Sequence, residues 1–326
     1  MSDAPRALLL AGPTASGKSA LALAVAQRLD GVVINADAMQ LYAELRVLTA
    51  RPTPEEEATV PHRLYGVRRA AEAASVAWWR EAALAEMAAA HAAGRLPILC
   101  GGTGLYFLSL TEGLSQIPAV PEAARGEARA LLAEIGAPAL HARLAAVDPE
   151  TAVALRPSDS QRLARAWEVW RGTGQGLATW QRQGAHTGPA RLGDRPWNFA
   201  ALLLDPPRDA LRAAIAARFA AMLAGGALEE VRGLLAQDLD PALPAMRAHG
   251  VPELAAHLRG RMSLAAAEER AVLNTGQYTK RQATWFRHHA LAEPGRTHII
   301  HARFAGLTQF PESQSRKIFS FLESWH

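Results

Sequence analysis

The chain has 326 residues, 49% of them hydrophobic, so it exceeds the length of an average domain and can bury a large core. Its formal net charge of +4 is modest, and the placement of its basic residues is therefore more informative than their number. The single cysteine, Cys100, excludes an internal disulfide bond and a cysteine metal cluster and favours a reducing compartment. The apolar run at 7–11 is too short for a signal sequence, and no stretch approaches the roughly 18 apolar residues of a membrane span. We therefore expect a cytoplasmic protein that does not associate with membranes.

A phosphate-binding loop is the first motif along the chain. Residues 12–19 read G-x-x-x-x-G-K-S, after the apolar run 7–11 and before a helical pattern that begins near Ala20. The glycines allow backbone N–H groups to turn inward, the next helix adds the positive end of its dipole, and Lys18 reaches the outer phosphates. A chance match in a glycine-rich turn is the alternative, and the strand, loop and helix context argues against it. The predicted polyphosphate site comprises Gly12, Pro13, Thr14, Ala15, Ser16, Gly17, Lys18 and Ser19, with the Ser19 hydroxyl placed for Mg²⁺.

A carboxylate ends the second predicted strand. The β-branched run at 32–37 closes with Asp37, which places this side chain at the carboxyl edge of a parallel sheet, beside the phosphate loop. Ligands bind at that edge in such folds. The alternative is that Asp37 caps the turn at 39–44.

A second glycine-rich turn follows a later strand. The segment 51–61 is rich in Pro and Glu and predicts a surface loop, and 76–93 predicts an alanine-rich helix. The short strand 96–100 then leads into Gly-Gly-Thr-Gly at 101–104. Such a turn allows close approach of a ligand, and the Thr103 hydroxyl is its one polar side chain. A glycine turn alone would explain this motif, but beside a phosphate loop it predicts a second wall of the same site.

The pattern changes near residue 116. Only helical patterns continue to about 174, and strand character returns at 199–205. We therefore predict an α/β fold with a P-loop NTPase-like parallel sheet flanked by helices and an all-helical insert. The predicted boundaries place 1–115 and 195–326 in the catalytic core and 116–194 in the insert.

A helix with one apolar face begins at 158–160 within the insert. Leu163 and Trp167 share the apolar face, whereas Gln161 and Arg165 lie on the opposite side. The following segment, 172–192, is rich in Gly, Gln, Thr and Arg and predicts a mobile arm.

Arg218 occupies an unusual place on the predicted helix 209–223. It lies at the edge of the apolar stripe of Leu211, Ile215 and Phe219, so we expect it to be partly buried. A buried cation needs an anionic partner. That partner is either a protein carboxylate or a ligand phosphate, and the sequence leaves both open.

A long helix capped by Ser263 extends to about His289. One of its faces has no acidic residue after Glu269, a pattern typical of contact with a phosphate backbone. A solvated charged face is the alternative. That face carries Gln277, Lys280, Arg281, Thr284, Arg287 and His288.

Taken together, these motifs resemble the tRNA dimethylallyltransferase (isopentenyl-tRNA transferase) family. The resemblance implies transfer of a dimethylallyl group from dimethylallyl diphosphate to N6 of the adenine 3′-adjacent to the anticodon, with Mg²⁺ as cofactor. We expect the enzyme to be a monomer. The matching stretches run in order: the phosphate loop, Asp37-Ala38-Met39-Gln40, Gly-Gly-Thr-Gly-Leu-Tyr at 101–106, residues 160–169, and Lys-Arg-Gln-x-Thr-Trp-Phe at 280–286.

The resemblance also implies roles for individual residues. Lys18, Ser19 with Mg²⁺, and Arg218 would neutralise the leaving diphosphate. Thr103 would hydrogen-bond its bridging region, and Asp37 would hold or accept the proton of the adenine amino group. The catalytic residues are then Asp37, Thr103 and Arg218.

Contact with tRNA is implied for three parts of the chain. The target base must leave its stack to be reached, so residues near Gln40 would contact the exposed base. The insert and the long basic helix would contact the anticodon stem-loop. Around 248–252 the family pattern is lost, and no contact is assigned there. The implied tRNA-binding residues are Asp37, Ala38, Met39, Gln40, Thr103, Arg125, Gln161, Arg162, Leu163, Ala164, Arg165, Lys280, Arg281, Thr284 and Arg287.

Two other functions share parts of this pattern. A P-loop small-molecule kinase would have the phosphate loop and an acidic strand end, but it gives no reason for the basic helix or the insert. An ATP-switched RNA-binding protein would need a strand-end carboxylate for Mg²⁺ and water activation, and Asp205 after the strand 199–204 is the candidate.

Overall fold

The computed structural model describes residues 4–306, 308 and 310–325. The chain divides into two compact units, which we call the core unit (Met1–Glu112 with Pro189–His326) and the inserted unit (Gly113–Gly188). These boundaries differ by a few residues from those of the sequence analysis. Residues 189–194 belong to the core unit because the Ala190 N–H donates to the Leu110 carbonyl at 2.7 Å.

A six-stranded sheet forms the centre of the core unit. Its order is β3-β2-β4-β1-β7-β8, and the paired strands are parallel. Leu10 lies opposite Cys100 on one side and Leu202 on the other, so the carboxyl ends of the three central strands reach the same edge. The edge strands β3 and β8 were missed in the sequence because each is short. The strands are β1 (Arg6–Ala11), β2 (Gly31–Asn35), β3 (His62–Arg63), β4 (Leu96–Gly101), β7 (Asn198–Leu204) and β8 (Thr297–Ile300).

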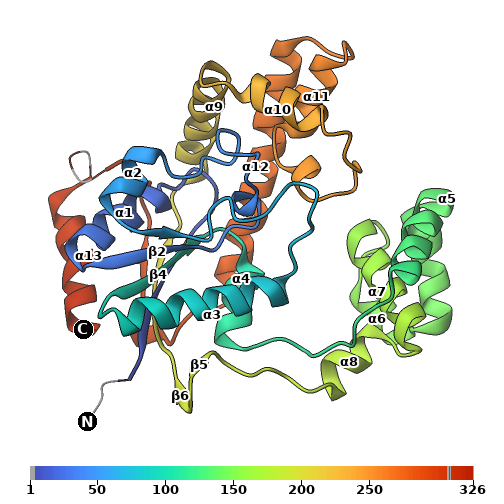
Figure 1. Cartoon of the computed structure of the whole chain (residues 1–326), viewed down its shortest axis with the longest axis horizontal. Coiled ribbons are helices and arrows are strands. Elements are labelled where there is room, and N and C mark those ends of the chain that lie inside the picture. Colours follow the sequence, from blue (N-terminus) through green and yellow to red (C-terminus); the bar gives the residue numbers. More distant parts are fainter. Residues whose placement is uncertain (1–3, 307, 309, 326) are drawn as a thin grey trace. The chain divides into compact units, whose positions relative to one another are not determined.

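Helices cover both faces of this sheet (Figure 1). Successive side chains of a strand point to opposite faces, so a strand buried on both faces is apolar throughout. In β1, Leu9 packs with α3 (Val76–Ala92) and α4 (Gly104–Thr111). Leu8 and Leu10 pack on the other face with α1 (Lys18–Arg28) and α13 (Glu312–Trp325).

A helical layer completes the core unit. Its elements are packed around a separate apolar cluster that includes Phe219, Val231 and Leu254. The Ser263 Oγ accepts the Ala266 N–H at 3.2 Å, which confirms the predicted cap of the long helix. The layer consists of α9 (Arg208–Ala224), α10 (Ala227–Leu235), η2 (Ala245–Arg247), α11 (Val251–Leu258) and α12 (Leu264–His288).

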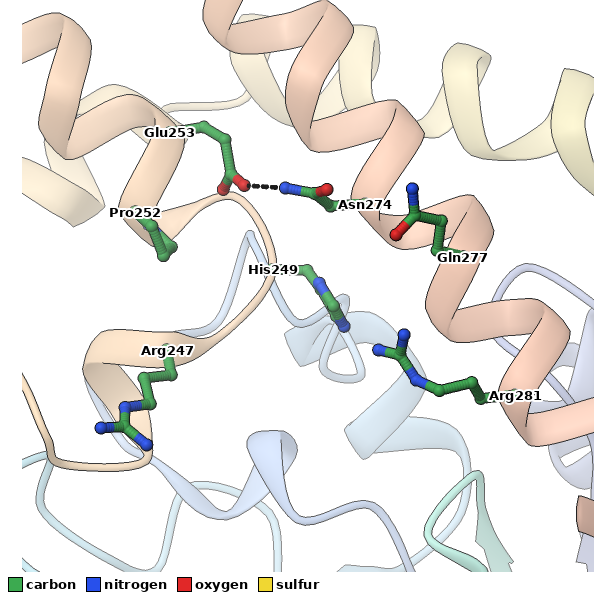
Figure 2. A pocket seen from close by; sticks show the side chains of 7 residues that line it. All are labelled: Arg247, His249, Pro252, Glu253, Asn274, Gln277 and Arg281. Carbon is green, nitrogen blue, oxygen red and sulfur yellow. Dashed lines mark hydrogen bonds between the residues drawn. The ribbon is translucent and has the colours of Figure 1, made fainter. Parts of the chain in front are cut away.

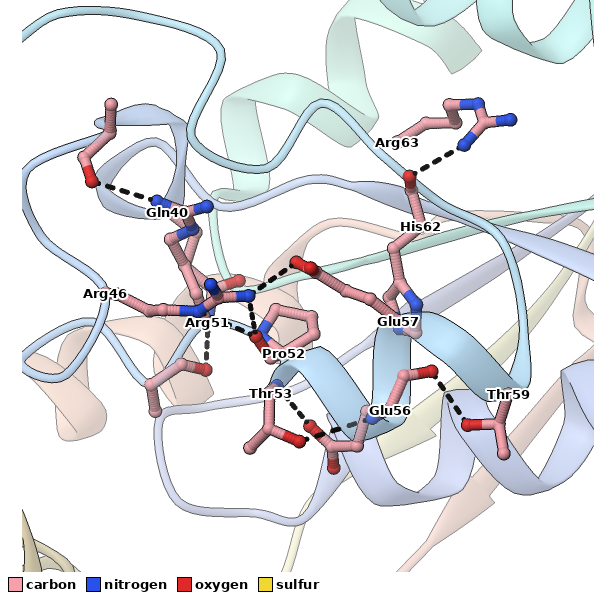
Figure 3. A network of polar contacts seen from close by, with 12 residues as sticks. Gln40, Arg46, Arg51, Pro52, Thr53, Glu56, Glu57, Thr59, His62 and Arg63 are labelled. Carbon is pink, nitrogen blue, oxygen red and sulfur yellow. Dashed lines mark hydrogen bonds and ion pairs between the residues drawn. The ribbon is translucent and has the colours of Figure 1, made fainter.

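The segment after β2 is more ordered than the sequence predicted. The expected surface loop at 51–61 contains α2 (Pro54–Thr59), preceded by η1 (Met39–Leu41). A capping box explains α2: the Thr53 Oγ1 accepts the Glu56 N–H, and the Glu56 carboxylate accepts the Thr53 N–H. Figure 3 shows this box beside Arg46, whose guanidinium contacts the Pro52 carbonyl and Glu57.

The inserted unit is helical, as its sequence predicts. α5 (Glu122–Val147) packs along α7 (Ser160–Thr173), with Leu140, Leu144 and Trp167 in the shared core. α6 (Pro149–Ala154) and α8 (Leu177–Gln183) complete it. By length and composition α5 could cross a membrane, but it bends at Gly136, where φ is 76°. The pair α9 and α10 is long and apolar enough only when the two helices are taken together, and they are bent by 68° at their junction.

The prediction of a mobile arm at 172–192 is wrong for much of that segment. α8 occupies its centre, and the Asp148 carboxylate accepts the Leu177 N–H at 3.0 Å. The end of the segment pairs as β5 (Arg191–Leu192) with β6 (Arg195–Pro196) in the core unit. A glycine- and glutamine-rich composition was misleading here, because Asp148 supplies a distant helix cap that the local pattern does not contain.

Candidate functional site

The phosphate loop connects β1 to α1 and is held from behind by the segment after β8. Gly17 has φ of 93°, and a Cβ there would lie 1.8 Å from the Phe304 carbonyl oxygen. The Phe304 N–H donates to the Ser16 carbonyl at 3.0 Å. Glycine is therefore required at 17 for both its backbone conformation and the close approach of another chain segment.

The amides of this loop are not all available to a ligand. The Thr14 N–H donates to the Gln282 Oε1 at 2.8 Å, and the Ser16 N–H donates to the Pro13 carbonyl at 3.2 Å. The prediction that the whole loop cradles phosphate is thus too broad. The amides of Lys18 and Ser19 open α1, where first-turn N–H groups have no partner inside the helix. The buried Ser16 hydroxyl also has no hydrogen-bond partner in the described chain.

A cavity of about 500 Å³ opens beside the loop and is rich in cations. Lys18 lines it from α1, Arg218 from α9, and Arg303 from the segment after β8. Arg46 and Arg51 also line it, and Glu56 is the one carboxylate among the lining residues. This excess of positive charge fits an anionic ligand such as a diphosphate.

Burial destabilises the charged form of two of these cations in the ligand-free protein. It lowers the pKa of Lys18 and of Arg218, and in both cases the Asp37 carboxylate acts in the opposite direction. Arg218 is half-buried and makes no ion pair with a carboxylate in the described part of the chain. Of the two partners that the sequence left open for Arg218, the structure does not provide the protein carboxylate.

Asp37 lies just beyond the end of β2, where a neighbouring asparagine fixes its backbone. The Asn35 side chain accepts the Asp37 N–H at 2.8 Å and donates to the Asp37 carbonyl at 3.0 Å. The Asp37 Oδ1 accepts the Met39 N–H at 3.0 Å, so the capping role also exists. Asp37 is half-buried, and within the described residues its Oδ2 accepts no hydrogen bond, which leaves this oxygen for a substrate proton.

Thr103 is hydrogen-bonded to the same segment at the end of β2. Its N–H donates to the Ala36 carbonyl at 3.2 Å, and its Oγ1 accepts the Ala38 N–H at 3.0 Å. The hydroxyl hydrogen of Thr103 is not used by that second bond and can be donated to a ligand. A Cβ at Gly101 would lie 2.0 Å from the Ala36 carbonyl oxygen, so glycine allows the two strand ends to come this close.

Neutral aromatic side chains surround Asp37. Burial, and then the Asp37 charge, raise the pKa of the hydroxyls of Tyr106 and Tyr278. The Tyr106 ring stacks on Trp79 with centroids 4.0 Å apart, and the Trp79 indole N–H donates to the Asn35 carbonyl. The surroundings of the carboxylate therefore combine neutral aromatic side chains with the cations Lys18 and Arg218.

A second cavity, of about 220 Å³, lies between the start of α11 and α12. Figure 2 shows His249 and Arg281 extending toward each other, with Glu253 hydrogen-bonded to Asn274 at 2.6 Å. The His249 ring packs against Tyr278 with centroids 4.7 Å apart, and burial lowers its pKa. Of the residues that line this cavity, the sequence analysis assigned a role only to Arg281.

The predicted basic face of α12 is exposed, with one qualification. Lys280, Arg281 and Thr284 are exposed side chains. Arg287 instead makes two hydrogen bonds to the Asp205 carboxylate, at 2.8 and 3.1 Å. Its guanidinium is therefore already paired, and the prediction that it is free to bind tRNA phosphate is not supported by its contacts.

Two other predicted tRNA contacts lie inside the protein. Gln40 is buried, and its Nε2 donates to the carbonyls of Thr49 and Ala50. Leu163 is fully buried in the apolar cluster of the inserted unit, so its side chain packs the helices together.

The other residues predicted in the inserted unit lie at its surface. Gln161, Arg162 and Arg165 are exposed, and Ala164 is half-buried. The arginines already have acidic neighbours: Arg162 pairs with Asp159, Arg165 with Glu168, and Arg125 with Glu122. Exposed pairs of this kind are weak and exchange readily for other anions.

The donor set fits a metal that arrives with its ligand. The described residues contain no group of three or more His, Cys, Asp or Glu that could hold an ion. The Ser19 hydroxyl is exposed in the cavity beside the α1 amides. Mg²⁺ is commonly held by one or two protein oxygens together with substrate phosphates and water, so this single hydroxyl is compatible with it.

Known proteins resemble the chain over nearly its whole length. The profile of a family described as IPP transferase matches residues 40–289. A tRNA dimethylallyltransferase of Granulibacter bethesdensis is 57% identical over 321 residues, which cover 98% of this chain and 99% of that protein. The solved full-length tRNA isopentenylpyrophosphate transferase of Bacillus halodurans is 30% identical, with a TM-score of 0.67 over 98% of this chain and 96% of that one. A eukaryotic dimethylallyltransferase acting on tRNA, 22% identical, shares the fold with a TM-score of 0.79 over 98% of this chain and 79% of that one.

Replacing Arg218 with methionine should separate stability from anion binding. Removal of a half-buried charge without a protein partner relieves a desolvation cost, so we expect the midpoint of thermal unfolding of the ligand-free protein to stay equal or rise. Affinity for inorganic diphosphate, measured by titration calorimetry, should fall roughly tenfold or more, because a charge-assisted contact is lost. Arg212→Met, at an exposed position of the same helix, should change neither quantity. A loss of stability with unchanged diphosphate affinity would assign Arg218 to the fold instead.

Proposed function

The chain belongs to the IPP transferase family, the tRNA dimethylallyltransferases, and we propose that its residues carry out dimethylallyl transfer to tRNA at the site described above. The donor is dimethylallyl diphosphate, and the acceptor is N6 of the adenine 3′-adjacent to the anticodon. The observation that carries the proposal is the position of Asp37, a carboxylate whose charge acts on Lys18 and Arg218, two of the five cations that line the cavity. The expectation that the enzyme is a cytoplasmic monomer forms part of the same proposal.

Transfer breaks the bond between C1 of the dimethylallyl group and the diphosphate oxygen. The leaving diphosphate takes the electron pair of that bond, so negative charge grows on it in the transition state. Lys18, Arg218 and the first amides of α1 are placed to stabilise this charge. Mg²⁺, held by Ser19 and the diphosphate, would supply further charge neutralisation.

The acceptor nitrogen forms the new bond to C1 and loses a proton. An adenine amino group is a weak nucleophile, so its orientation matters as much as its basicity. The free Oδ2 of Asp37 accepts the departing proton, while Oδ1 remains bonded to the Met39 N–H. Thr103, held by the Ala38 N–H, donates its hydroxyl hydrogen to the diphosphate near the breaking bond.

The substrate base has to leave the anticodon loop to reach Asp37. Neutral Tyr278, which is half-buried near the carboxylate, would offer its ring to an extruded base, whereas the Tyr106 ring is buried against Trp79. Lys280 and Arg281 on the exposed face of α12 would contact the phosphates of the stem-loop, and Gln161 and Arg165 would do so from the inserted unit.

The two alternative functions are less compatible with the contacts of the site. The ATP-switched reading needs Asp205 for Mg²⁺ and water activation, but both oxygens of this carboxylate bind Arg287. A small-molecule kinase does not need the exposed basic residues on α12 or an inserted helical unit. Neither reading explains why the chain matches tRNA-modifying enzymes over nearly its full length.

The direct test is a transfer assay on unmodified tRNA. The protein is incubated with Mg²⁺, dimethylallyl diphosphate and a tRNA whose anticodon loop carries consecutive adenines, and the nucleosides are then weighed after digestion. We expect the mass gain of one dimethylallyl group on the adenosine beside the anticodon. No gain, with ATP consumed on a small-molecule acceptor, would favour the kinase.

Asp37→Asn should abolish turnover but spare tRNA binding. The amide retains an oxygen that can accept the Met39 N–H, so the turn stays intact, but it cannot take up the substrate proton. We expect the single-turnover rate to fall by about 10²- to 10⁴-fold and the tRNA dissociation constant to change less than about threefold. Undiminished turnover would remove Asp37 as the proton acceptor.

Lys280→Ala should reduce the salt dependence of tRNA binding. Loss of one phosphate contact lowers the slope of log affinity against log salt by about 0.7 to 0.9. Arg287→Ala is the matched control on the same helix, and because Arg287 is already bonded to Asp205 we expect no change in slope. An unchanged slope for Lys280→Ala would mean that this face is only solvated.

A further inference from the structure

A single buried side chain joins the two loops of the site. Gln282 of α12 is 5% exposed. Its Oε1 accepts the Thr14 N–H of the phosphate loop at 2.8 Å, and its Nε2 donates to the Gly102 carbonyl at 2.9 Å. A carboxamide provides an acceptor and a donor on neighbouring atoms, and among the longer side chains only glutamine does so at this reach.

The loop at 101–104 is shaped around this amide. A Cβ at Gly102 would lie 2.3 Å from the Gln282 Nε2 and 3.3 Å from the Gly12 carbonyl oxygen. Gly102 directly precedes Thr103, whose N–H and hydroxyl are bonded to the strand end that carries Asp37. The position of the amide thus determines how far the Thr103 turn lies from the phosphate loop.

We propose that Gln282 is a positioning residue for the transfer reaction. By fixing the separation of the two loops, it holds the groups that receive the diphosphate and the groups that receive the acceptor on opposite sides of one reacting carbon. The inference rests on the proposed function, and it deepens that function by assigning a role to a residue that touches neither substrate. Gln282 acts through Thr14 and Gly102, whose polar groups it already occupies.

The geometry indicates an effect on the reaction rate rather than on tRNA binding. The Thr14 N–H is withdrawn from the ligand, and tRNA would contact the exposed side of α12, so neither substrate loses a direct contact when Gln282 is changed. A shift of about 1 Å between reacting groups costs on the order of 100-fold in rate. The expected signature is therefore a lower kcat with a nearly unchanged KM for tRNA.

Two substitutions test the role of the two hydrogen bonds. Gln282→Met keeps the length of the side chain but removes both bonds, and we expect kcat to fall on the order of 100-fold with KM for tRNA within about threefold. Gln282→Glu keeps the acceptor for Thr14 but, when ionised, places an oxygen against the Gly102 carbonyl. A buried carboxyl in that place has a raised pKa, so protonation restores the missing donor as the pH falls from about 8.5 to about 6.

The pH dependence distinguishes positioning from a merely structural role. For Gln282→Glu we expect kcat, divided by the wild-type kcat at the same pH, to rise roughly fivefold or more over that interval. Taking the ratio cancels the titration of Lys18, which both proteins share, and burial keeps the Tyr278 hydroxyl neutral over this interval because it raises the pKa of that group. For Gln282→Met the ratio should stay low and constant. A wild-type kcat for Gln282→Met, or a ratio for Gln282→Glu that does not change with pH, would overturn the inference.

A matched control and a second readout complete the experiment. Thr279→Val alters a buried side chain on the same helix whose hydroxyl has no hydrogen-bond partner in the described chain, so it should leave kcat unchanged. If the wild-type protein transfers no dimethylallyl group, the proposed function fails, and affinity for inorganic diphosphate then decides the inference. Binding that is roughly fivefold or more weaker in Gln282→Met supports a role in shaping the phosphate loop, and equal binding overturns it.

Discussion

Positive charge that the protein does not neutralise is the constraint on which the site depends. Burial removes Lys18 and Arg218 from water and lowers the pKa of each. The negative charge of Asp37, the residue proposed to take up the acceptor proton, acts in the opposite direction on both. An anion that enters the cavity therefore contacts cations that folding has already desolvated, so binding does not add that cost. Such a ligand stabilises the folded protein, and the same charges remain in place when the ligand gains further negative charge.

Holding these charges together requires contacts between parts of the chain that are far apart in sequence. The aligned carboxyl ends of β1, β4 and β7 set the coarse positions, and apolar packing on both faces keeps the sheet rigid. The fine positions come from single hydrogen bonds. Phe304 holds the phosphate loop at Ser16, Thr103 holds the strand end at Ala36, and Gln282 spans the two loops.

This difference between coarse positions, set by the sheet, and fine positions, set by single hydrogen bonds, explains what the sequence could predict. Strands, helices and the phosphate loop follow from local periodicity and spacing, so the strand-end position of Asp37 and the partial burial of Arg218 could be predicted. Gln282 was not assigned a role, because a helical wheel shows that a residue is buried but not which distant carbonyl or amide its side chain contacts. Arg303 was not assigned one because it lies in the irregular segment after β8, where no periodic pattern predicts the position of a side chain. Gln40 and Leu163, two of the implied tRNA contacts, are buried, because a motif identifies a segment, whereas the packing of other segments decides which of its side chains face outward.

The arrangement also separates two chemistries that share one loop motif. A phosphoryl-transfer site directs cations and a carboxylate at the same phosphorus centre, because attacking and leaving oxygens flank it. In the described part of this chain Lys18, Arg218 and Arg303 line the cavity beside the phosphate loop, and Asp37 lies just beyond the end of the neighbouring strand β2. Asp205, the other carboxylate at the end of a central strand, is bound by Arg287 and withdrawn from the cavity. With the carboxylate free to act on the acceptor rather than on water or phosphorus, the loop serves a reaction in which diphosphate departs intact and a carbon is transferred.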